Sequence, residues 1–376
     1  MLRWLATVTL LVILAGCSEA PIEPERIAFL AADNQTGDPS FDWTTVVINR
    51  GLAAAVGTSV KAADSIADAR ASGTANRFVY NTLSRGPETG ELRLHSTVFD
   101  PSGHHLVREF TVTGNALQVI NRMAGNFSSE PYPLGITTED QLRKWPVPTG
   151  DARAFETRCL ELADGEPGFG AALSGCVTGL NAAGSKETVR AILGKVPDDK
   201  SAHFSPEVQY EFAQTYMALK DYGKAVPLFR QVTSTHPEIK NVLGYAMALG
   251  GDCEGGKKSI AEYSRLEGQE PNAFDSLGEV SFFCGQFKDA EQYFTESGPK
   301  YPVGEGQVQP IKAAAARLMT GDVPGAEQLA SAQLQKLKKS APQVAAQLEP
   351  VWKSIVAAGT AEERRKRIEA TLIHRP

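Results

Sequence analysis

The chain has 376 residues, enough for two or three domains, and its 42% apolar and 22% charged residues are ordinary for a globular protein. Its formal net charge is −6, from 38 basic and 44 acidic residues. A mildly acidic chain without a basic stripe lacks the electrostatic footprint of nucleic-acid binding. These totals argue against nucleic acid as the main partner and leave most other classes of function open.

The N-terminal segment carries the clearest motif. Arg3 precedes an almost wholly apolar run over residues 5–14, which is too short to cross a hydrocarbon core of about 30 Å. The run ends in Leu14-Ala15-Gly16-Cys17. These four residues resemble the lipobox of bacterial lipoproteins, whose pattern is Leu-[Ala/Ser]-[Gly/Ala]-Cys. The alternative is an ordinary signal peptide with a chance cysteine.

The lipobox resemblance implies a signal peptide over residues 1–16 and a lipid on Cys17. Several acyl chains on one residue anchor a protein firmly, since each buried methylene contributes about 0.8 kcal/mol. Under the family's sorting rule, Ser18 in place of aspartate favours the outer membrane. Residues 17–25 are polar with two prolines and are expected to be an extended tether. We therefore expect a membrane-anchored lipoprotein of the cell envelope that faces the periplasm.

Residues 26–130 are expected to form a small α/β domain. Apolar or alternating segments at 26–32, 77–85, 92–100 and 105–114 predict strands, and helices are expected after Ser40, near 61–71 and over 115–127. The region resembles the TolB N-terminal-like domain at Phe29, Asn34, Thr36, Gly37, Asp38, Pro39, Phe41, Asp42 and Trp43, and at the hairpin residues Leu92, Arg93, Leu94, Phe99, Asp100, Gly103, Leu106 and Val107. That resemblance implies an envelope interaction or sensing module. Residues 131–150, which are rich in proline, are expected to form an ordered linker.

Residues 151–376 contain an internal repeat. Small, aromatic and proline residues recur 65 positions apart in the pairs Ala213 and Gly278, Ala225 and Ala290, Phe229 and Phe294, and Pro237 and Pro302. A shortened unit around Gly244 lies between them, and weaker units occupy 167–197 and 311–339, before two terminal helices. The pattern resembles the tetratricopeptide repeat, in which small residues let two helices approach closely. The fold class expected is therefore α+β and multidomain, with a small α/β domain followed by an all-α helical solenoid.

The resemblance to tetratricopeptide repeats also implies a concave groove lined by the first helix of each pair. Its inward positions would be Tyr210, Gln214, Asn241, Tyr245, Asp275 and Glu279. Polar groups with two tyrosines suit an extended peptide segment. The alternative is an ordinary solvated surface that binds nothing.

Four cysteines remain once Cys17 is set aside, namely Cys159, Cys176, Cys253 and Cys284. An even number in an exported chain indicates disulfides, and four cysteines allow three pairings. Local pairing, 159 with 176 and 253 with 284, is the simplest hypothesis, and free buried thiols are the alternative. We expect no metal, because the sequence has neither a C-x-x-C motif nor histidines at ligand spacing.

The sequence contains no G-x-S-x-G, H-E-x-x-H, Walker or dinucleotide-binding motif, so we predict no catalytic residues and no cofactor. The function expected is that of a lipid-anchored scaffold or adaptor that binds a protein or peptide partner in the envelope. One alternative is a permanent structural or assembly subunit of an envelope or secretion complex. The other is an enzyme with an unrecognised site.

Overall fold

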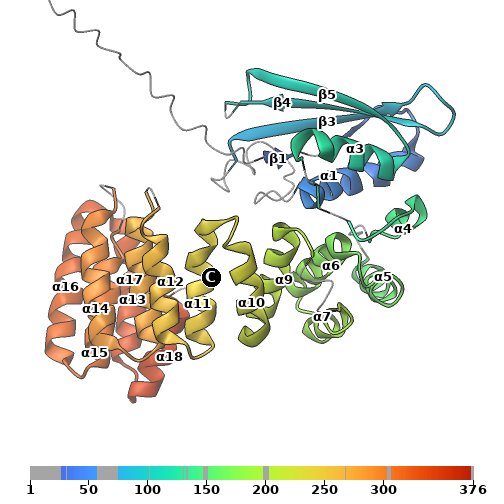
Figure 1. The fold of residues 1–376 in the computed structure, drawn as a ribbon. Coiled ribbons are helices and arrows are strands. Elements are labelled where there is room, and N and C mark those ends of the chain that lie inside the picture. The colour runs from blue at the N-terminus through green and yellow to red at the C-terminus, as the bar shows by residue number, and fades with distance from the viewer. Residues whose placement is uncertain are drawn as a thin grey trace, which may run out of the picture.

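The computed structural model describes residues 27–373 except 31, 57–74, 101, 130, 133, 147–150, 198–202, 267 and 303–305. Cys17, the tether and the helix expected near 61–71 lie outside the described residues. A small mixed sheet near the N-terminus is followed by many helices, which makes the fold α+β as expected (Figure 1).

The sheet has the strand order β1-β3-β4-β5, and the short β2 also pairs with β3. β1 (Ile27–Phe29) and β2 (Asp33–Asn34) run parallel to β3 (Arg77–Arg85). β4 (Leu92–Phe99) and β5 (Leu106–Gly114) continue from β3 as an antiparallel meander. Burial alternates along β3 and β4 with the period of two that a half-buried sheet imposes. The strands predicted over residues 77–85, 92–100 and 105–114 are confirmed as β3, β4 and β5.

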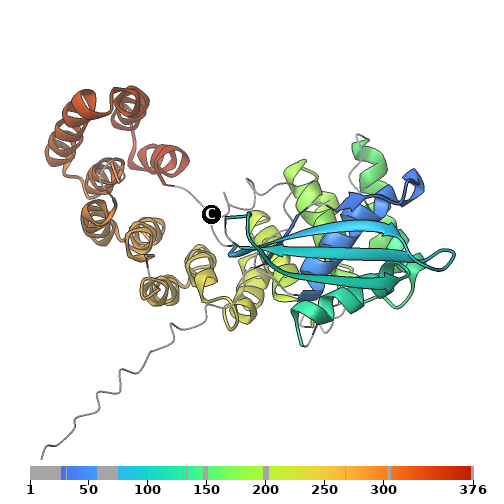
Figure 2. The ribbon, with the colours of Figure 1, turned by 90° about the horizontal axis from the view of Figure 1, so that it is seen from above.

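Two helices, α1 (Asp42–Val56) and α3 (Ala116–Phe127), cover one face of the sheet, and Figure 2 looks onto the other face. A 3₁₀ turn (Pro39–Phe41) precedes α1. Beneath the sheet, the Asn81 amide donates a hydrogen bond of 2.7 Å to Asn49 Oδ1, and the Ser96 hydroxyl donates to Asn81 Oδ1. This buried chain of polar groups connects α1 with β3 and β4.

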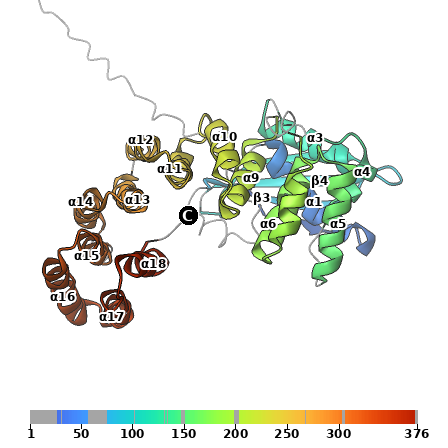
Figure 3. The ribbon, with the colours of Figure 1, turned by 90° about the horizontal axis from the view of Figure 1, so that it is seen from below.

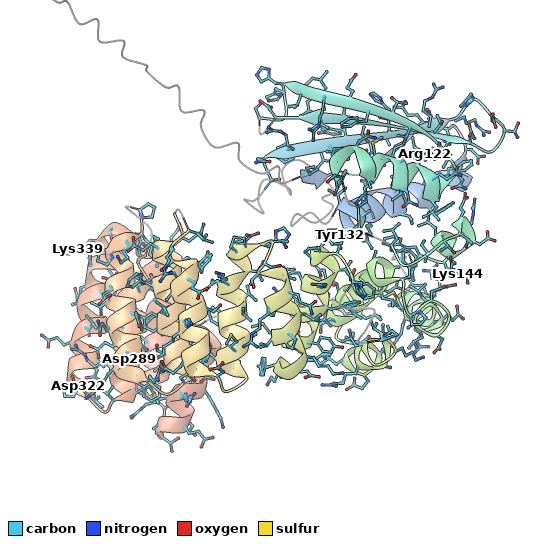
Figure 4. The ribbon with its side chains drawn as sticks, viewed as in Figure 1. Arg122, Tyr132, Lys144, Asp289, Asp322 and Lys339 are labelled. Carbon is cyan, nitrogen blue, oxygen red and sulfur yellow. A yellow bond between two sulfur atoms is a disulfide. The ribbon has the colours of Figure 1, made fainter. Side chains whose placement is uncertain are left out.

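The segment expected as a linker is packed between the sheet region and the first helices. It contains the short helix α4 (Glu139–Arg143), and Trp145 beyond it packs edge-on against Phe169 with ring centres 5.0 Å apart. The Tyr132 N–H donates to the carbonyl oxygen of Ala55 at 2.7 Å. Figure 4 shows Tyr132 between the two layers and Lys144 beside the first helices.

The remaining helices form a curved row of antiparallel neighbours (Figure 3). Their bounds are α5 (Ala152–Gly165), α6 (Gly170–Ala182), α7 (Lys186–Leu193), α9 (Pro206–Ala218), α10 (Tyr222–Val232), α11 (Lys240–Leu249), α12 (Cys253–Tyr263), α13 (Glu270–Phe283), α14 (Phe287–Ser297), α15 (Gln309–Met319), α16 (Val323–Ser340), α17 (Pro342–Val356) and α18 (Ala361–Thr371). Short 3₁₀ turns, Pro237–Ile239 and Gly298–Lys300, follow α10 and α14. In Figure 3, α11, α13 and α15 line the inner side of the curve, and α12, α14 and α16 lie outside. The last helix, α18, turns back to the inner side and contacts α15 and α17.

The buried apolar residues form two main clusters. The first runs from Ile27 to Val280 and so crosses the expected domain boundary at residue 150, where α1 packs on α6 and α9. The second runs from Phe282 to Ile373. The α/β region and the first half of the helical row therefore share one continuous core.

Two disulfides join helices that the sequence places side by side. Cys159 on α5 pairs with Cys176 on α6, with Cα atoms 5.7 Å apart. Cys253, the first residue of α12, pairs with Cys284, just after α13, at a Cα separation of 6.1 Å. Both are the local pairings expected from the sequence. The second one links two successive helix pairs.

Replacing the second disulfide, by Cys253→Ala with Cys284→Ala, should lower the free energy of unfolding by roughly 3–4 kcal/mol. The reason is that a cross-link closing a loop of 31 residues restricts the unfolded chain. Chemical unfolding of the oxidised wild type and the double variant measures the difference. Peptide mapping without reductant is the control, and four alkylatable thiols in the native chain would contradict the pairing.

A candidate binding groove

The helix pairs approach each other closely at the small residues of the repeat. A β-carbon on Gly278 of α13 would lie 2.5 Å from the Phe294 ring of α14. A β-carbon on Gly244 of α11 would collide with Ile260 of α12 and with the Gly256 carbonyl oxygen. Protein interiors have no room for such atoms, so these two pairs need glycine at their crossings. These contacts fix the spacing of the helices that line the inner side.

Tyr210 and Gln214, two of the residues expected in the groove, lie together on α9. The Gln214 amide donates a hydrogen bond of 2.6 Å to the Tyr210 hydroxyl. Both side chains line a hollow of about 450 Å³, which we call the open hollow. Its walls come from α6, α9, the start of α10 and the end of α11, with lining residues Thr178, Asn181, Tyr210, Glu211, Gln214, Thr215, Met217, Ala218, Lys220, Tyr222 and Leu249.

Tyr245 and Glu279 lie deeper than a groove lining, because only 4% of each residue is exposed between α11 and α13. The Tyr245 hydroxyl donates a hydrogen bond to Glu279 Oε2. Asn241, one turn before Tyr245 on α11, is half-buried, and its Oδ1 atom accepts no hydrogen bond within the described chain. Contact between these residues and a partner stays a prediction.

A buried lysine joins two of the expected acidic residues. Lys312 on α15 donates hydrogen bonds of 2.7 Å to Glu279 Oε1 and of 2.9 Å to each carboxylate oxygen of Asp275. Its ammonium also lies 5.5 Å from the centre of the Phe294 ring, at cation–π distance. We call Tyr245, Asp275, Glu279 and Lys312 the buried charge cluster. Sequence reasoning missed Lys312, although a single cation before four alanines was a visible signal.

Two carboxylates share one ammonium in this cluster. Burial and the neighbouring charges shift the pKa values of Glu279, Lys312 and Tyr245. Burial raises the pKa of Glu279, against the opposing charge of Lys312, and the Asp275 carboxylate adds to the rise. For Lys312, burial would lower the pKa, but the charges of Glu279 and Asp275 outweigh it and raise the pKa. Burial and the Glu279 charge also raise the pKa of Tyr245 well above its usual value. Through its hydrogen bonds to both carboxylates, the Lys312 ammonium bridges α13 and α15.

A second hollow, of about 300 Å³, lies where α18 meets the inner helices. Ala248, Leu249 and Phe283 line one side, and α18 supplies Glu362, Arg365, Lys366 and Glu369. The Arg365 guanidinium donates to the Phe283 carbonyl oxygen at 2.7 Å and to Glu369 at 2.8 Å. Leu249 lines both hollows, so they are neighbours. We call the two hollows together the concave groove.

The two hollows of the concave groove differ in how their charged side chains are held. At its far end the cations of α18 are paired within that helix, Arg365 with Glu369 and Lys366 with Glu362. In the open hollow, Thr178 donates a hydrogen bond of 2.7 Å to Glu211. The open hollow thus offers hydroxyl, amide and aromatic groups that suit an extended segment of polypeptide.

Comparison with known protein families finds none that matches the chain, and a search of curated proteins finds no match either. Within the described ranges no helix is both long and apolar enough to cross a bilayer. The same residues contain no group of three His, Cys, Asp or Glu side chains placed to hold a metal ion. The expectations of no metal, no cofactor and no enzymatic activity stay predictions.

Lys312→Met should lower the free energy of unfolding by roughly 3–5 kcal/mol, because it leaves two carboxylates near each other in the interior without their cation. The wild-type contribution should be full below pH 10.5, the unperturbed pKa of lysine, and be lost as the pH rises through the higher folded pKa. Denaturant unfolding followed by circular dichroism measures both effects.

Two further variants separate charge from packing in this experiment. Lys338→Met removes a lysine that is 51% exposed and pairs with Glu349, so the change should stay below about 1 kcal/mol. Adding Asp275→Asn and Glu279→Gln to Lys312→Met should recover part of the loss, since the stranded charges are gone. Equal unfolding midpoints for Lys312→Met and Lys338→Met would contradict the proposed bridge.

Proposed function

We propose that the chain is a lipid-anchored protein of the cell envelope that binds an extended segment of a protein partner in its concave groove. In this proposal Cys17 carries the lipid, the sheet region is a TolB-like module, and the curved row is a tetratricopeptide-like solenoid that faces the periplasm, from the outer membrane as Ser18 suggests. The observation that carries the proposal is the open hollow, in which Tyr210 and Gln214 come together as the repeat pattern predicts.

Three other features support the proposal. The two disulfides suit an oxidising compartment outside the cytosol. The glycine contacts between paired helices are the close approach that the repeat pattern requires. The buried charge cluster fixes neighbouring inner helices, and a rigid groove loses less entropy when it binds a segment.

The distribution of exposed apolar groups favours a partner that binds the helical row transiently rather than a subunit that packs on it permanently. Within the described chain the exposed large apolar residues are Tyr80, Leu106 and Val107, all of which belong to the sheet. Permanent interfaces bury large apolar surfaces, and the described helices present no such residue. The alternative of a permanent subunit therefore has less support than the adaptor.

A photo-crosslinking amino acid at position 214 should capture a protein partner in intact cells, because that side chain lines the open hollow. The matched control is the same substitution at Gln328, an exposed residue of the outer helix α16. Gel analysis and mass spectrometry identify what is captured. If position 328 captures the same proteins with equal yield, or position 214 captures none, the groove proposal is wrong.

Cys17→Ser should abolish metabolic labelling with palmitate and release the protein from the membrane fraction, because the lipobox thiol is the expected site of lipid attachment. Substitution of Ser18 by alanine is the control and should leave labelling unchanged. Labelling that survives Cys17→Ser would remove the lipid anchor from the proposal and leave the groove untouched.

A further inference from the structure

The turn between α9 and α10 is built differently from the equivalent turns of the row. In the turns α6–α7, α11–α12, α13–α14 and α15–α16, the residue after the C-cap has a left-handed backbone and is glycine, with φ of 82°, 100°, 74° and 94° at Gly184, Gly251, Gly285 and Gly321. At the α9–α10 turn the same position is Lys220, with φ of 62°. Lys220 is the one non-glycine residue with positive φ in the part of the chain that the structure describes.

The left-handed conformation is costly for a residue with a side chain, because its β-carbon crowds the following carbonyl oxygen. The turn itself does not require lysine. The Asp221 N–H donates to the Tyr216 carbonyl oxygen at 2.8 Å, and Ser185, Asp252 and Gln286 make the same bond after a glycine. Glycine would therefore close this turn equally well and without strain.

A favourable interaction with the α9 dipole does not account for Lys220. A cation near a helix C-terminus is stabilising, but it gains this at any position of the last turn. Ala218 is exposed in that turn and has ordinary helical backbone. Lysine at that position would give the same benefit without a strained residue. Strain kept where it has no structural use points to function.

Lys220 lies in the open hollow, at the end formed by Tyr222 and Leu249. The hollow has two charged residues, Lys220 and Glu211, and Glu211 is held by Thr178. No ion pair or side-chain hydrogen bond within the described chain involves the Lys220 ammonium, and the residue is exposed. The Lys220 ammonium is therefore a positive charge that no carboxylate of the described chain pairs, and it lies in the same hollow as the Tyr210 and Gln214 pair.

We propose that Lys220 is the recognition residue of the groove and binds an acidic side chain of the partner segment. This inference rests on the proposed function, and it adds the chemistry of the partner: an extended segment with Asp or Glu at the position that faces the α9–α10 turn. A charge-assisted hydrogen bond from an ammonium to a carboxylate is shorter and stronger than the neutral bonds that the rest of the hollow offers.

The test uses the full chain in detergent and an array of random-sequence peptides. Each peptide is present in two versions, called twins, that are identical except that one position is Glu in one twin and Gln in the other. The wild type should bind Glu twins about tenfold more tightly than Gln twins. Lys220→Gly should bind both twins with the affinity of the wild type for the Gln twin. Its unfolding temperature should rise by roughly 1–3 °C, because the strain is gone. Lys220→Arg should keep the preference for Glu.

Gly285→Lys is the matched control, since a β-carbon there meets no other atom and only backbone strain is added. It should lower the unfolding temperature by roughly 1–3 °C and leave the Glu preference as in the wild type. If twins bind equally to the wild type, or Lys220→Gly keeps the preference, the role of Lys220 is wrong and the groove proposal stands. If the full chain captures no peptide, the groove proposal fails, and the role of Lys220 fails with it.

Discussion

The close approach of paired helices at Gly244 and Gly278 is the constraint on which the helical row depends. A β-carbon at either position would occupy space that Ile260 or Phe294 already fills, and a densely packed interior does not absorb such an atom. The next residues along α11 and α13, Tyr245 and Glu279, face each other between the pairs and form a hydrogen bond. Packing inside the pairs and polar contacts between the pairs together form the inner surface.

Much of the fold could be predicted because its signals are local or periodic. The alternation in residues 77–114 predicted β3, β4 and β5, and the recurrence from Ala213 to Gly278 predicted helix pairs at the observed places. The shared core across residue 150 could not be predicted, since it depends on α1 packing against helices more than a hundred residues away. The return of α18 to the inner side likewise involves contacts between residues far apart in the sequence, among them the hydrogen bond from Arg365 to the Phe283 carbonyl oxygen.

The candidate site was predicted only in part, for a related reason. Repeat spacing tells which positions face inward, and it brought Tyr210 and Gln214 to the same hollow. The spacing does not tell how deep an inward position lies. It therefore predicted that Tyr245 and Glu279 line the groove, as it did for Tyr210 and Gln214, although Tyr245 and Glu279 are buried. Lys312 is separated from Glu279 by 33 residues and belongs to a weaker repeat, so no local pattern connects the two. The left-handed backbone of Lys220 could not be predicted from its own residue type. It can be recognised only when its turn is aligned with the turns that have glycine at the same position.

The two unusual lysines of the row have opposite consequences for stability, and together they divide the inner side into two parts. Lys312 is buried, fully bonded and close to an aromatic ring, so it makes the neighbouring inner helices α13 and α15 one rigid unit. Lys220 is exposed and strained, and it lowers the stability of the one turn that borders the open hollow. Four equivalent turns of this chain have glycine at the left-handed position, where it adopts this backbone without the strain of a side chain. An exposed cation kept at a strained position of the open hollow has the arrangement of a specificity determinant, because it favours a partner that brings a carboxylate to that point.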